Sequence, residues 1–368
     1  MKIDFANLQY QHNLYKEEIE EAILRVVRDC NFIMGFQIEE LERNLEKFTK
    51  AKYAISCSSG TDALLLAMMA LDIQPDDEII TTPFTFFATA ETIAFLKAKP
   101  VFVDIDEKTY NIDVSKIEEK ITSKTKAIIL VSLYGQPADI DEINQIAKKY
   151  NLKVIIDGAQ SFGSIYNGVS DSALGDISCT SFFPAKPLGC YGDGGAVFTN
   201  DEKLAAKIKS LRLHGQSKRY HHQYIGIGGR LDTIQAAVLN VKLKYYKEDL
   251  RLRQEVASKY TKALENRSNI ILPYVSKKSI SSWAQYSIRV KNRDELQNKL
   301  KEKGIPTAIH YPMPLHLQES FKYLNLKEGS FPIAEKISKE IISLPMNPYL
   351  TDEEIGYIVK NIEKELRC

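Results

Sequence analysis

An alternation of short β-rich runs with longer amphipathic segments, from about residue 53 to residue 200, constrains the fold more than any other feature of this sequence. The runs EIITTPF, PVFVDID, AIILVSLYG and KVIIDGAQ have strand character, and the stretches between them have helix character. Residues 127–131 and 154–156 are continuously apolar, which is typical of strands buried on both faces. The sequence therefore predicts an α/β fold with a mostly parallel sheet covered by helices.

The remaining segments suggest a second, smaller unit. Residues 139–150 carry acidic side chains at the start and lysines at the end, which predicts a crossover helix. A long periodic stretch over residues 231–264 predicts a helix that leaves the sheet, after which QYSIRV and RDELQNKLKEKG predict a strand and a helix. We therefore expect a large domain with the N-terminal segment over residues 1–244, and a smaller C-terminal α/β domain over residues 245–368.

The charge balance excludes several classes of partner. The chain has 49 Lys and Arg against 48 Asp and Glu, so the net charge of +1 gives no field that would gather nucleic acid or an anionic membrane. No window is apolar over a membrane-spanning length, and the first residues lack a secretory signal. These features favour a cytoplasmic enzyme without a nucleic-acid or membrane partner.

Cysteines and histidines give no metal-binding pattern. The five cysteines are scattered without a CxxC pair, and the six histidines show no HExxH spacing. We therefore predict no metal and no disulfide framework. The residues concerned are Cys30, Cys57, Cys179, Cys190 and Cys368, and His12, His214, His221, His222, His310 and His316.

The segment SCTSFFPAKPLGCYGDGG contains one lysine, Lys186, among aromatic, Pro and Gly residues. A lysine removed from water has a lowered pKa, and its neutral amine can form a Schiff base. We expect the surrounding glycines to let the backbone approach a flat ligand, at Gly189, Gly192, Gly194 and Gly195. From this segment alone, a lysine in a surface loop is an equal alternative.

Asp157 follows the apolar run VII and is predicted to lie at the carboxyl end of a strand, where open α/β sheets bind their ligands. A carboxylate there can pair with a protonated pyridine nitrogen, as a pyridoxal cofactor requires. Gln160, three residues later, could hydrogen-bond a ring hydroxyl. An aspartate that caps a turn is the alternative.

The stretch SSGTDALLL predicts a helix start that can bind phosphate, through Gly60, Thr61 and Asp62, with Ser181 as a further hydroxyl. An ordinary helix N-cap is the alternative. Phe86, in TTPFTFF, could stack on a cofactor ring, although an isolated phenylalanine is more often part of a core.

The order of these elements resembles that of the DegT and StrS family of nucleotide-sugar aminotransferases over essentially the whole chain. The matching stretches include SSGTDALLLAMMAL, DEIITTPFTFFATAETI, KPVFVDIDEKTYNID, TSFFPAKPLGCYGDGGAVFTND and GRLDTIQAA. The resemblance implies the fold of aspartate aminotransferase (fold type I), pyridoxal 5'-phosphate as cofactor, and a homodimer with shared active sites.

The family's residue roles can be carried onto the matching positions. Lys186 resembles the Schiff-base lysine and Asp157 the pyridine partner. The other implied cofactor contacts are Gln160 to the ring hydroxyl, Phe86 to the ring face, and Thr61, Asp62 and Ser181 to the phosphate. The implied contacts to the nucleotide sugar are Arg230, from the neighbouring subunit, His310 and Tyr311.

The stretches SLYGQPADID, LHGQSKRYHHQYIG, WAQYSIRV and HYPMPLHLQ resemble the branch that aminates the 3-keto group of a UDP-linked 2-acetamido-2-deoxy-hexuronic acid, in the synthesis of surface polysaccharides or other glycans. L-glutamate is then the amino donor. Amination at carbon 3 or 4 of a dTDP-, UDP- or GDP-linked keto-deoxyhexose is the alternative substrate. A uronate needs a cation, for which we expect Arg230, or otherwise Arg289.

Some positions depart from the family pattern. Ala185 replaces a frequent Ser, and Gly228 with Gly229 replace an Asn-Ser pair whose Asn reaches the cofactor phosphate of the neighbouring subunit. Loss of one hydrogen bond to a charged group is worth roughly 1.5–3 kcal/mol, which would weaken cofactor binding. This change is the sequence support for a second alternative, a non-catalytic sensor or scaffold. A sugar dehydratase is disfavoured, because those relatives have His at the position of Lys186.

Overall fold

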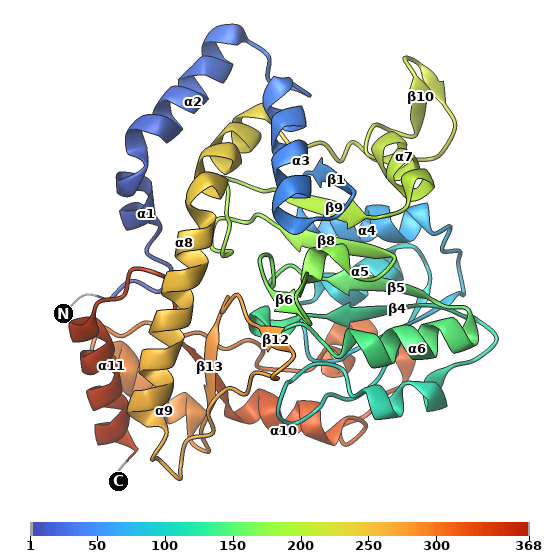
Figure 1. Ribbon diagram of the computed structural model, residues 1–368. Helices are drawn as coiled ribbons and strands as arrows, with labels where there is room; N and C mark the ends of the chain where they lie inside the picture. Colours follow the sequence, from blue (N-terminus) through green and yellow to red (C-terminus); the bar gives the residue numbers. More distant parts are fainter. Residues whose placement is uncertain (1–2, 367–368) are drawn as a thin grey trace.

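A seven-stranded sheet lies at the centre of the computed structural model, which describes residues 3–366 (Figure 1). The strand order is β1-β9-β8-β5-β4-β2-β3, and β9 alone runs against its two neighbours. The strands of this sheet are β1 (Tyr53–Cys57), β2 (Glu78–Thr81), β3 (Lys99–Phe102), β4 (Thr125–Val131), β5 (Lys153–Asp157), β8 (Ile177–Ser181) and β9 (Gly195–Thr199). The predicted α/β class with a mostly parallel sheet is confirmed.

The continuous apolar runs are explained by burial of both sheet faces. Because side chains alternate along a strand, Ile128 and Leu130 of β4 enter one core, and Ala127 and Ile129 enter the core on the opposite face. The helices that cover the sheet include α3 (Phe36–Thr49), α4 (Gly60–Ala70), α5 (Ala88–Phe95), α6 (Ile140–Tyr150) and α7 (Glu202–Leu211). The helix predicted over residues 139–150 is α6.

Helix α8 (Thr233–Leu264) connects the sheet with the C-terminal half of the molecule (Figure 1). Leu239 and Leu243 pack in a core beside the sheet, whereas Tyr260 and Leu264 pack in the C-terminal core. The division predicted between residues 244 and 245 therefore falls inside one continuous helix, and it stays a prediction. The C-terminal half contains β13 (Tyr286–Arg289), α9 (Arg293–Glu302), α10 (Pro332–Glu340), β14 (Ile341–Leu344) and α11 (Asp352–Glu365).

The N-terminal segment joins both halves. Ile3 packs in the C-terminal core, and α2 (Lys16–Asp29), which follows α1 (Leu8–Leu14), packs on α8. The described residues form three smaller sheets. One contains β6 (Ile165–Tyr166), β7 (Val169–Ser170) and β12 (Ser279–Ile280), the second contains β10 (Gln216–Lys218) and β11 (His221–His222), and the third contains β13 and β14.

Within residues 3–366 no helix is long and apolar enough to cross a membrane. The same residues contain no cluster of three or more His, Cys, Asp or Glu side chains suited to a metal ion. Cys57, Cys179 and Cys190 are buried free thiols and Cys30 is an exposed one, while Cys368 lies outside the described residues.

Candidate active site

A cavity of about 520 Å³ lies at the carboxyl ends of β5 and β8. It brings together nine of the residues that the sequence singled out: Gly60, Thr61, Phe86, Asp157, Gln160, Ser181, Lys186, His310 and Tyr311. Asp62 and Arg230 do not line it. Residues from positions 59 to 311 thus meet in one place because the strand ends and the C-terminal half converge there.

Lys186 belongs to the loop that follows β8. Its backbone N–H donates to the backbone carbonyl of Phe183 at 2.8 Å. Burial lowers the pKa of the Lys186 amine, and the charge of Asp157 opposes this shift. The amine makes no hydrogen bond or ion pair with any residue that the structure describes. An amine with these properties is available as a nucleophile and as a base.

Asp157 ends β5 with only 6% of its surface exposed. Its carboxylate accepts hydrogen bonds from Thr89 Oγ1 at 2.7 Å and from the Ala159 N–H at 3.2 Å. Burial raises the pKa of Asp157, and these two hydrogen bonds oppose that shift. The charge of Lys186 acts in the same direction as the two hydrogen bonds, but Asp157 forms no ion pair within residues 3–366. A buried carboxylate of this kind suits a cationic partner such as a protonated pyridine nitrogen.

Thr89 was not singled out from the sequence. It lies in α5 and is fully buried, and its hydroxyl also contacts that of Thr85 at 3.0 Å. The spacing of four residues in TFFATA places both hydroxyls on one side of a helical turn. This spacing is the feature of the sequence from which the pair of threonines could have been predicted. No local pattern indicated that this turn would face β5.

Helix α4 begins at the cavity as predicted. Ser59 caps it by accepting from the Asp62 N–H at 3.0 Å, and the Asp62 carboxylate accepts from the Ser58 hydroxyl. The N–H groups of Gly60 and Thr61 have no partner among the described residues, so these two, rather than Asp62, are free to bind a phosphate. The prediction for Asp62 is corrected in this respect.

Gly60 and Ser181 approach each other so closely that a side chain at position 60 is excluded. A Cβ atom at Gly60 would lie 2.7 Å from the Cβ of Ser181. The end of β8 therefore stands directly beside the start of α4, which places the Ser181 hydroxyl next to the free helix N–H groups.

Other residues that line the cavity carry aromatic and amide groups. Gln160 accepts from the Tyr134 N–H at 2.7 Å and donates to the Tyr311 hydroxyl at 3.1 Å. The ring of Phe86, 56% exposed, lies 6.2 Å from the ring of Tyr311. His310 Nδ1 contacts Ser343 Oγ at 2.9 Å, and burial lowers the pKa of its imidazole to about 4, so the ring is neutral at pH 7.

The glycines around Lys186 have a different role from the one we predicted. None of Gly189, Gly192, Gly194 and Gly195 lines the cavity. A Cβ at Gly195 would lie 2.4 Å from the Ser59 carbonyl oxygen, and a Cβ at Gly189 would lie 2.4 Å from that of Pro184. Gly189 and Gly195 are therefore needed because the loop packs against the protein's own backbone, whereas Gly192 and Gly194 pack against side chains.

Arg230 lies just before α8, is partly exposed, and makes no ion pair with a described residue. The preceding residue, Gly229, accepts a hydrogen bond from the Ser58 N–H at 3.1 Å, which holds this segment near the start of α4. Gly228 leaves room for the ring of His214, whose nearest atom would be 3.1 Å from a Cβ at that position.

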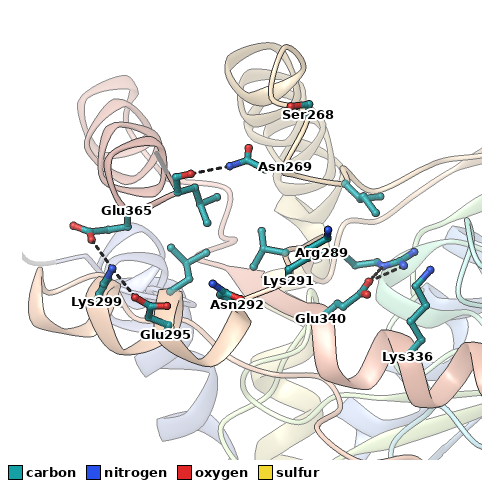
Figure 2. Close-up of a pocket in the computed structure, with 14 residues that line it drawn as sticks. Ser268, Asn269, Arg289, Lys291, Asn292, Glu295, Lys299, Lys336, Glu340 and Glu365 are labelled. Carbon is teal, nitrogen blue, oxygen red and sulfur yellow. Dashed lines mark hydrogen bonds and ion pairs between the residues drawn. The ribbon is translucent and has the colours of Figure 1, made fainter. Parts of the chain in front are cut away.

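Arg289 is not available to a substrate, which corrects the alternative that the sequence suggested. Its side chain is 2% exposed and lies in a separate groove of the C-terminal half (Figure 2). The guanidinium pairs with Glu340 at 2.7 Å and with Glu107 at 3.0 Å. Arg289 therefore has a structural role.

The arrangement at the cavity defines a class of site. A nucleophilic amine, a buried carboxylate, a helix start with free N–H groups and an exposed aromatic face fit the aldehyde, pyridine nitrogen, phosphate and ring of pyridoxal phosphate, respectively.

Comparisons with known proteins agree with this class. The chain belongs to the DegT/DnrJ/EryC1/StrS aminotransferase family, whose model matches residues 13–363. It is a pyridoxal-phosphate-dependent aminotransferase of this family. The structure of S. venezuelae DesV in complex with a ketimine intermediate is similar with a TM-score of 0.97 and 33% identity, covering 99% of this chain and 98% of DesV.

Two relatives differ in what their names state. The UDP-2-acetamido-2-deoxy-3-oxo-D-glucuronate aminotransferase of Pseudomonas aeruginosa is 49% identical over 97% of this chain and 98% of its own length. A pleiotropic regulatory protein of Geobacillus stearothermophilus is 45% identical over 100% of this chain and 99% of its own length.

Proposed function

We propose that this enzyme transfers the amino group of L-glutamate to the 3-keto group of a UDP-linked 2-acetamido-2-deoxy-hexuronic acid, in the synthesis of a surface polysaccharide or another glycan. The observation that carries the proposal is the unpartnered amine of Lys186 in the same cavity as the buried carboxylate of Asp157. The acceptor sugar is proposed from the name of the relative that shares 49% identity.

Several residues that line the cavity are then proposed to bind the cofactor. Lys186 binds the aldehyde carbon, Asp157 pairs with the ring nitrogen, and Gln160 donates its remaining amide hydrogen to the ring hydroxyl. Phe86 stacks on the ring, while Thr61 and Ser181, with the free N–H groups at the start of α4, hold the phosphate. When bound, pyridoxal phosphate supplies an electron sink for removal of the proton next to the reacting nitrogen.

The protein's own contribution to the reaction is proton movement and positioning. After the amine of glutamate has displaced it, Lys186 would take the substrate's Cα proton on Nζ and would deliver it to the cofactor carbon on the other side of the reacting nitrogen. With the sugar it would carry out the two transfers in the reverse order. The lowered pKa favours the neutral amine that the first of these transfers requires. Thr89 keeps the Asp157 carboxylate ionised and oriented by donating to Oδ2 at 2.7 Å.

His310 and Tyr311 face the cavity from the C-terminal half and are proposed to contact the nucleotide sugar. Arg230, which carries no ion pair, is proposed as the cation for the uronate carboxylate. Since Arg230 does not line the cavity of its own chain, we propose a homodimer in which it reaches the cavity of the partner.

Mixing two inactive variants tests the shared site. If Lys186→Ala and Arg230→Ala chains exchange freely, half of the dimers are mixed, and one of their two sites pairs an intact Lys186 with an intact Arg230. We expect roughly one quarter of the wild-type activity to return. No recovery, with exchange verified by native mass spectrometry, would place Arg230 in the site of its own chain or outside it.

The substrate is tested with keto sugar nucleotides. The protein purified with pyridoxal phosphate should be yellow and should lose this colour with L-glutamate. The aminated form is then offered UDP-2-acetamido-3-keto-glucuronic acid or 4-keto-6-deoxyhexoses on dTDP, UDP or GDP, and the products are identified by mass spectrometry. A product from a deoxyhexose alone would refute the uronate proposal.

A regulatory role without turnover is the second candidate, and the name of the relative at 45% identity is the observation that favours it. Persistent yellow colour in the presence of glutamate would support this candidate. The cofactor-binding residues that line the cavity, Lys186 and Asp157 among them, favour turnover.

A further inference from the structure

Lys242 is a buried lysine on α8 that forms no ion pair within residues 3–366. The residue is 4% exposed. Its ammonium donates to the backbone carbonyl of Gly189 at 2.8 Å and lies 4.6 Å from the centroid of the Tyr191 ring. Burial lowers the pKa of Lys242 to about 8, and the charges of Cys190 and Asp249 oppose this shift. Because a buried cation without a paired carboxylate is costly, these contacts indicate a function for Lys242.

Both contacts of Lys242 are made with the loop that carries Lys186. We call residues 182–194, between β8 and β9, the Lys186 loop. Gln235, which precedes Lys242 by two helical turns and lies on the same side of α8, accepts a hydrogen bond from the Tyr191 N–H at 2.8 Å. Helix α8 therefore holds the segment after Lys186 at two points.

The Gly189 contact lies where the chain before Lys186 and the chain after it meet. A Cβ at Gly189 would lie 2.4 Å from the Pro184 carbonyl oxygen, so the two flanks of Lys186 pack on each other. Gly189 is buried, and among the described residues Lys242 alone donates to its carbonyl. Loss of the ammonium would leave this carbonyl unpaired at the base of the turn that carries Lys186.

We propose that Lys242 is a positioning residue for Lys186, whose ammonium holds the Lys186 loop against α8 and thereby keeps the Lys186 amine shielded from water. Lys242 itself does not line the cavity that contains Lys186 and Asp157. The inference deepens the proposed function and rests on it, because it takes Lys186 as the amine that reacts.

The position of the loop, rather than the charge of Lys242, transmits the effect. Burial lowers the pKa of the Lys186 amine, and among the described residues Asp157 supplies the charge that opposes this shift. If the loop moves away from α8, water reaches Lys186 and its pKa returns toward the ordinary value of 10.5. A smaller share of the amine is then neutral at pH 7.

The experiment compares Lys242→Met, which keeps the side-chain length and removes the donor, with the wild type. Lys244→Met is the matched control on the same helix, because Lys244 is exposed and pairs with Glu18 at 2.9 Å. In the full-length protein, before pyridoxal phosphate is added, trace acetylation of Lys186 is followed by mass spectrometry as the pH is raised. We expect the midpoint of this profile to move to higher pH in Lys242→Met only, and to lie close to the wild-type value in Lys242→Arg.

Hydrogen exchange of the holoenzyme tests the position of the loop directly. The backbone amides of residues 182–194 should exchange roughly tenfold faster or more in Lys242→Met, whereas those of α4 should not change. An unchanged acetylation midpoint in Lys242→Met, or an equal shift in Lys244→Met, would overturn the inference. Unchanged exchange in the loop would also overturn it, because the charge of Lys242 would then act directly. If Lys242→Met does not fold, the shorter, uncharged Lys242→Gln takes its place.

Kinetics separate this inference from the proposed function. Because Lys186 acts in both half-reactions, Lys242→Met should lower both rates by the same factor, roughly tenfold, and change the KM for L-glutamate by less than about twofold. Loss in one half-reaction alone would overturn the role of Lys242 toward Lys186. A shifted midpoint and faster loop exchange in an enzyme that aminates no keto sugar would support the inference and refute the proposed function instead.

Discussion

Two cavities of similar size differ in how their charged and polar groups are partnered. The cavity beside Lys186 has a volume of about 520 Å³, and the groove in the C-terminal half has about 560 Å³. Arg289, which lines the groove, pairs with Glu340 and also with Glu107. Lys299 pairs with Glu295 at 2.8 Å and with Glu365 at 3.4 Å, and Figure 2 shows these two pairs together with the pair of Arg289 and Glu340. In the cavity, the Lys186 amine and the Gln285 carboxamide have no partner among the described residues.

The difference shows that volume alone does not locate a functional site. Ion pairs that satisfy each other stabilise local structure and leave little charge for a ligand. Groups that are desolvated and unpartnered are costly to the folded protein, so their concentration in one cavity indicates a site that is completed by ligands. Substitutions in the two cavities should therefore affect different properties.

Replacement of Lys186 should have the largest effect on catalysis. We expect Lys186→Ala to slow both half-reactions by about 10³-fold or more, because the residue that moves the proton is removed. Stopped-flow absorbance measures each half-reaction. Lys291→Ala, in the C-terminal groove, is the control and should match the wild type. Borohydride treatment should attach a pyridoxyl group to Lys186 in the wild type; labelling of another lysine would contradict the assignment.

Replacement of Arg289 should lower stability and leave catalysis unchanged. Arg289→Met removes the partner of Glu340 and Glu107 and leaves a carboxylate largely shielded from water, which costs roughly 3 kcal/mol in the free energy of unfolding. Lys299→Met, with more exposed pairs, should cost less than about 1 kcal/mol. Chemical denaturation measures both. An increased KM of Arg289→Met for a uronate sugar would restore Arg289 as a substrate contact.

Loss of the Thr89 hydroxyl should weaken the site moderately. Thr89→Val keeps the side-chain shape and removes one of two donors to Asp157, worth roughly 1.5–3 kcal/mol. We expect cofactor affinity and transamination rate to fall about tenfold, measured by absorbance titration and steady-state kinetics. Thr92→Val is the matched control, because the Thr92 hydroxyl donates to the Ala88 carbonyl one turn away. Equal effects of both substitutions would point to helix packing instead.

The sequence predicted the features of the site that depend on local pattern. Asp157 and Ser181 end strands, and α4 starts with a Ser-Gly pair, so their positions follow from rules about neighbouring residues. The contacts that join distant segments could not be predicted in this way. The hydrogen bond from Thr89 to Asp157 spans 68 positions, and nothing in either segment alone indicates the other.

Arg289 shows the converse error. In YSIRV it looked like an isolated cation, but Glu340 and Glu107, at sequence separations of 51 and 182, neutralise it in the folded chain. Gln285 stands at the start of the run QYSIRV, and only the tertiary structure brings it to the cavity beside Lys186. Charge and hydrogen-bond partners are properties of the tertiary structure, so the sequence could suggest these groups but could not assign their roles.

The smallest expected effect concerns Asp171, a buried carboxylate near the turn that follows Asp157. Like the unpartnered groups of the cavity, it has no ion pair within residues 3–366. It is 1% exposed, accepts from the Ser161 hydroxyl, and has an unpartnered Oδ1. Burial raises its pKa to about 6 from the ordinary value of 3.8, and the charge of Asp157 adds to the shift. Because the pKa of Asp171 is higher in the folded state, its contribution to the free energy of unfolding is fully present below pH 3.8 and is lost as the pH rises through 6.

Asp171→Asn removes the buried charge, so it should stabilise the protein more at pH 8 than at pH 5, by about 1 kcal/mol in the free energy of unfolding. Thermal unfolding at both pH values should show this as a difference of roughly 1–3 °C in the change of Tm. Asp29→Asn, an exposed substitution of the same type, should show no such difference. A stabilisation of Asp171→Asn that is the same at both pH values would mean that this carboxylate is already neutral at pH 8, or that it is charged and stabilised by a group that offsets its burial.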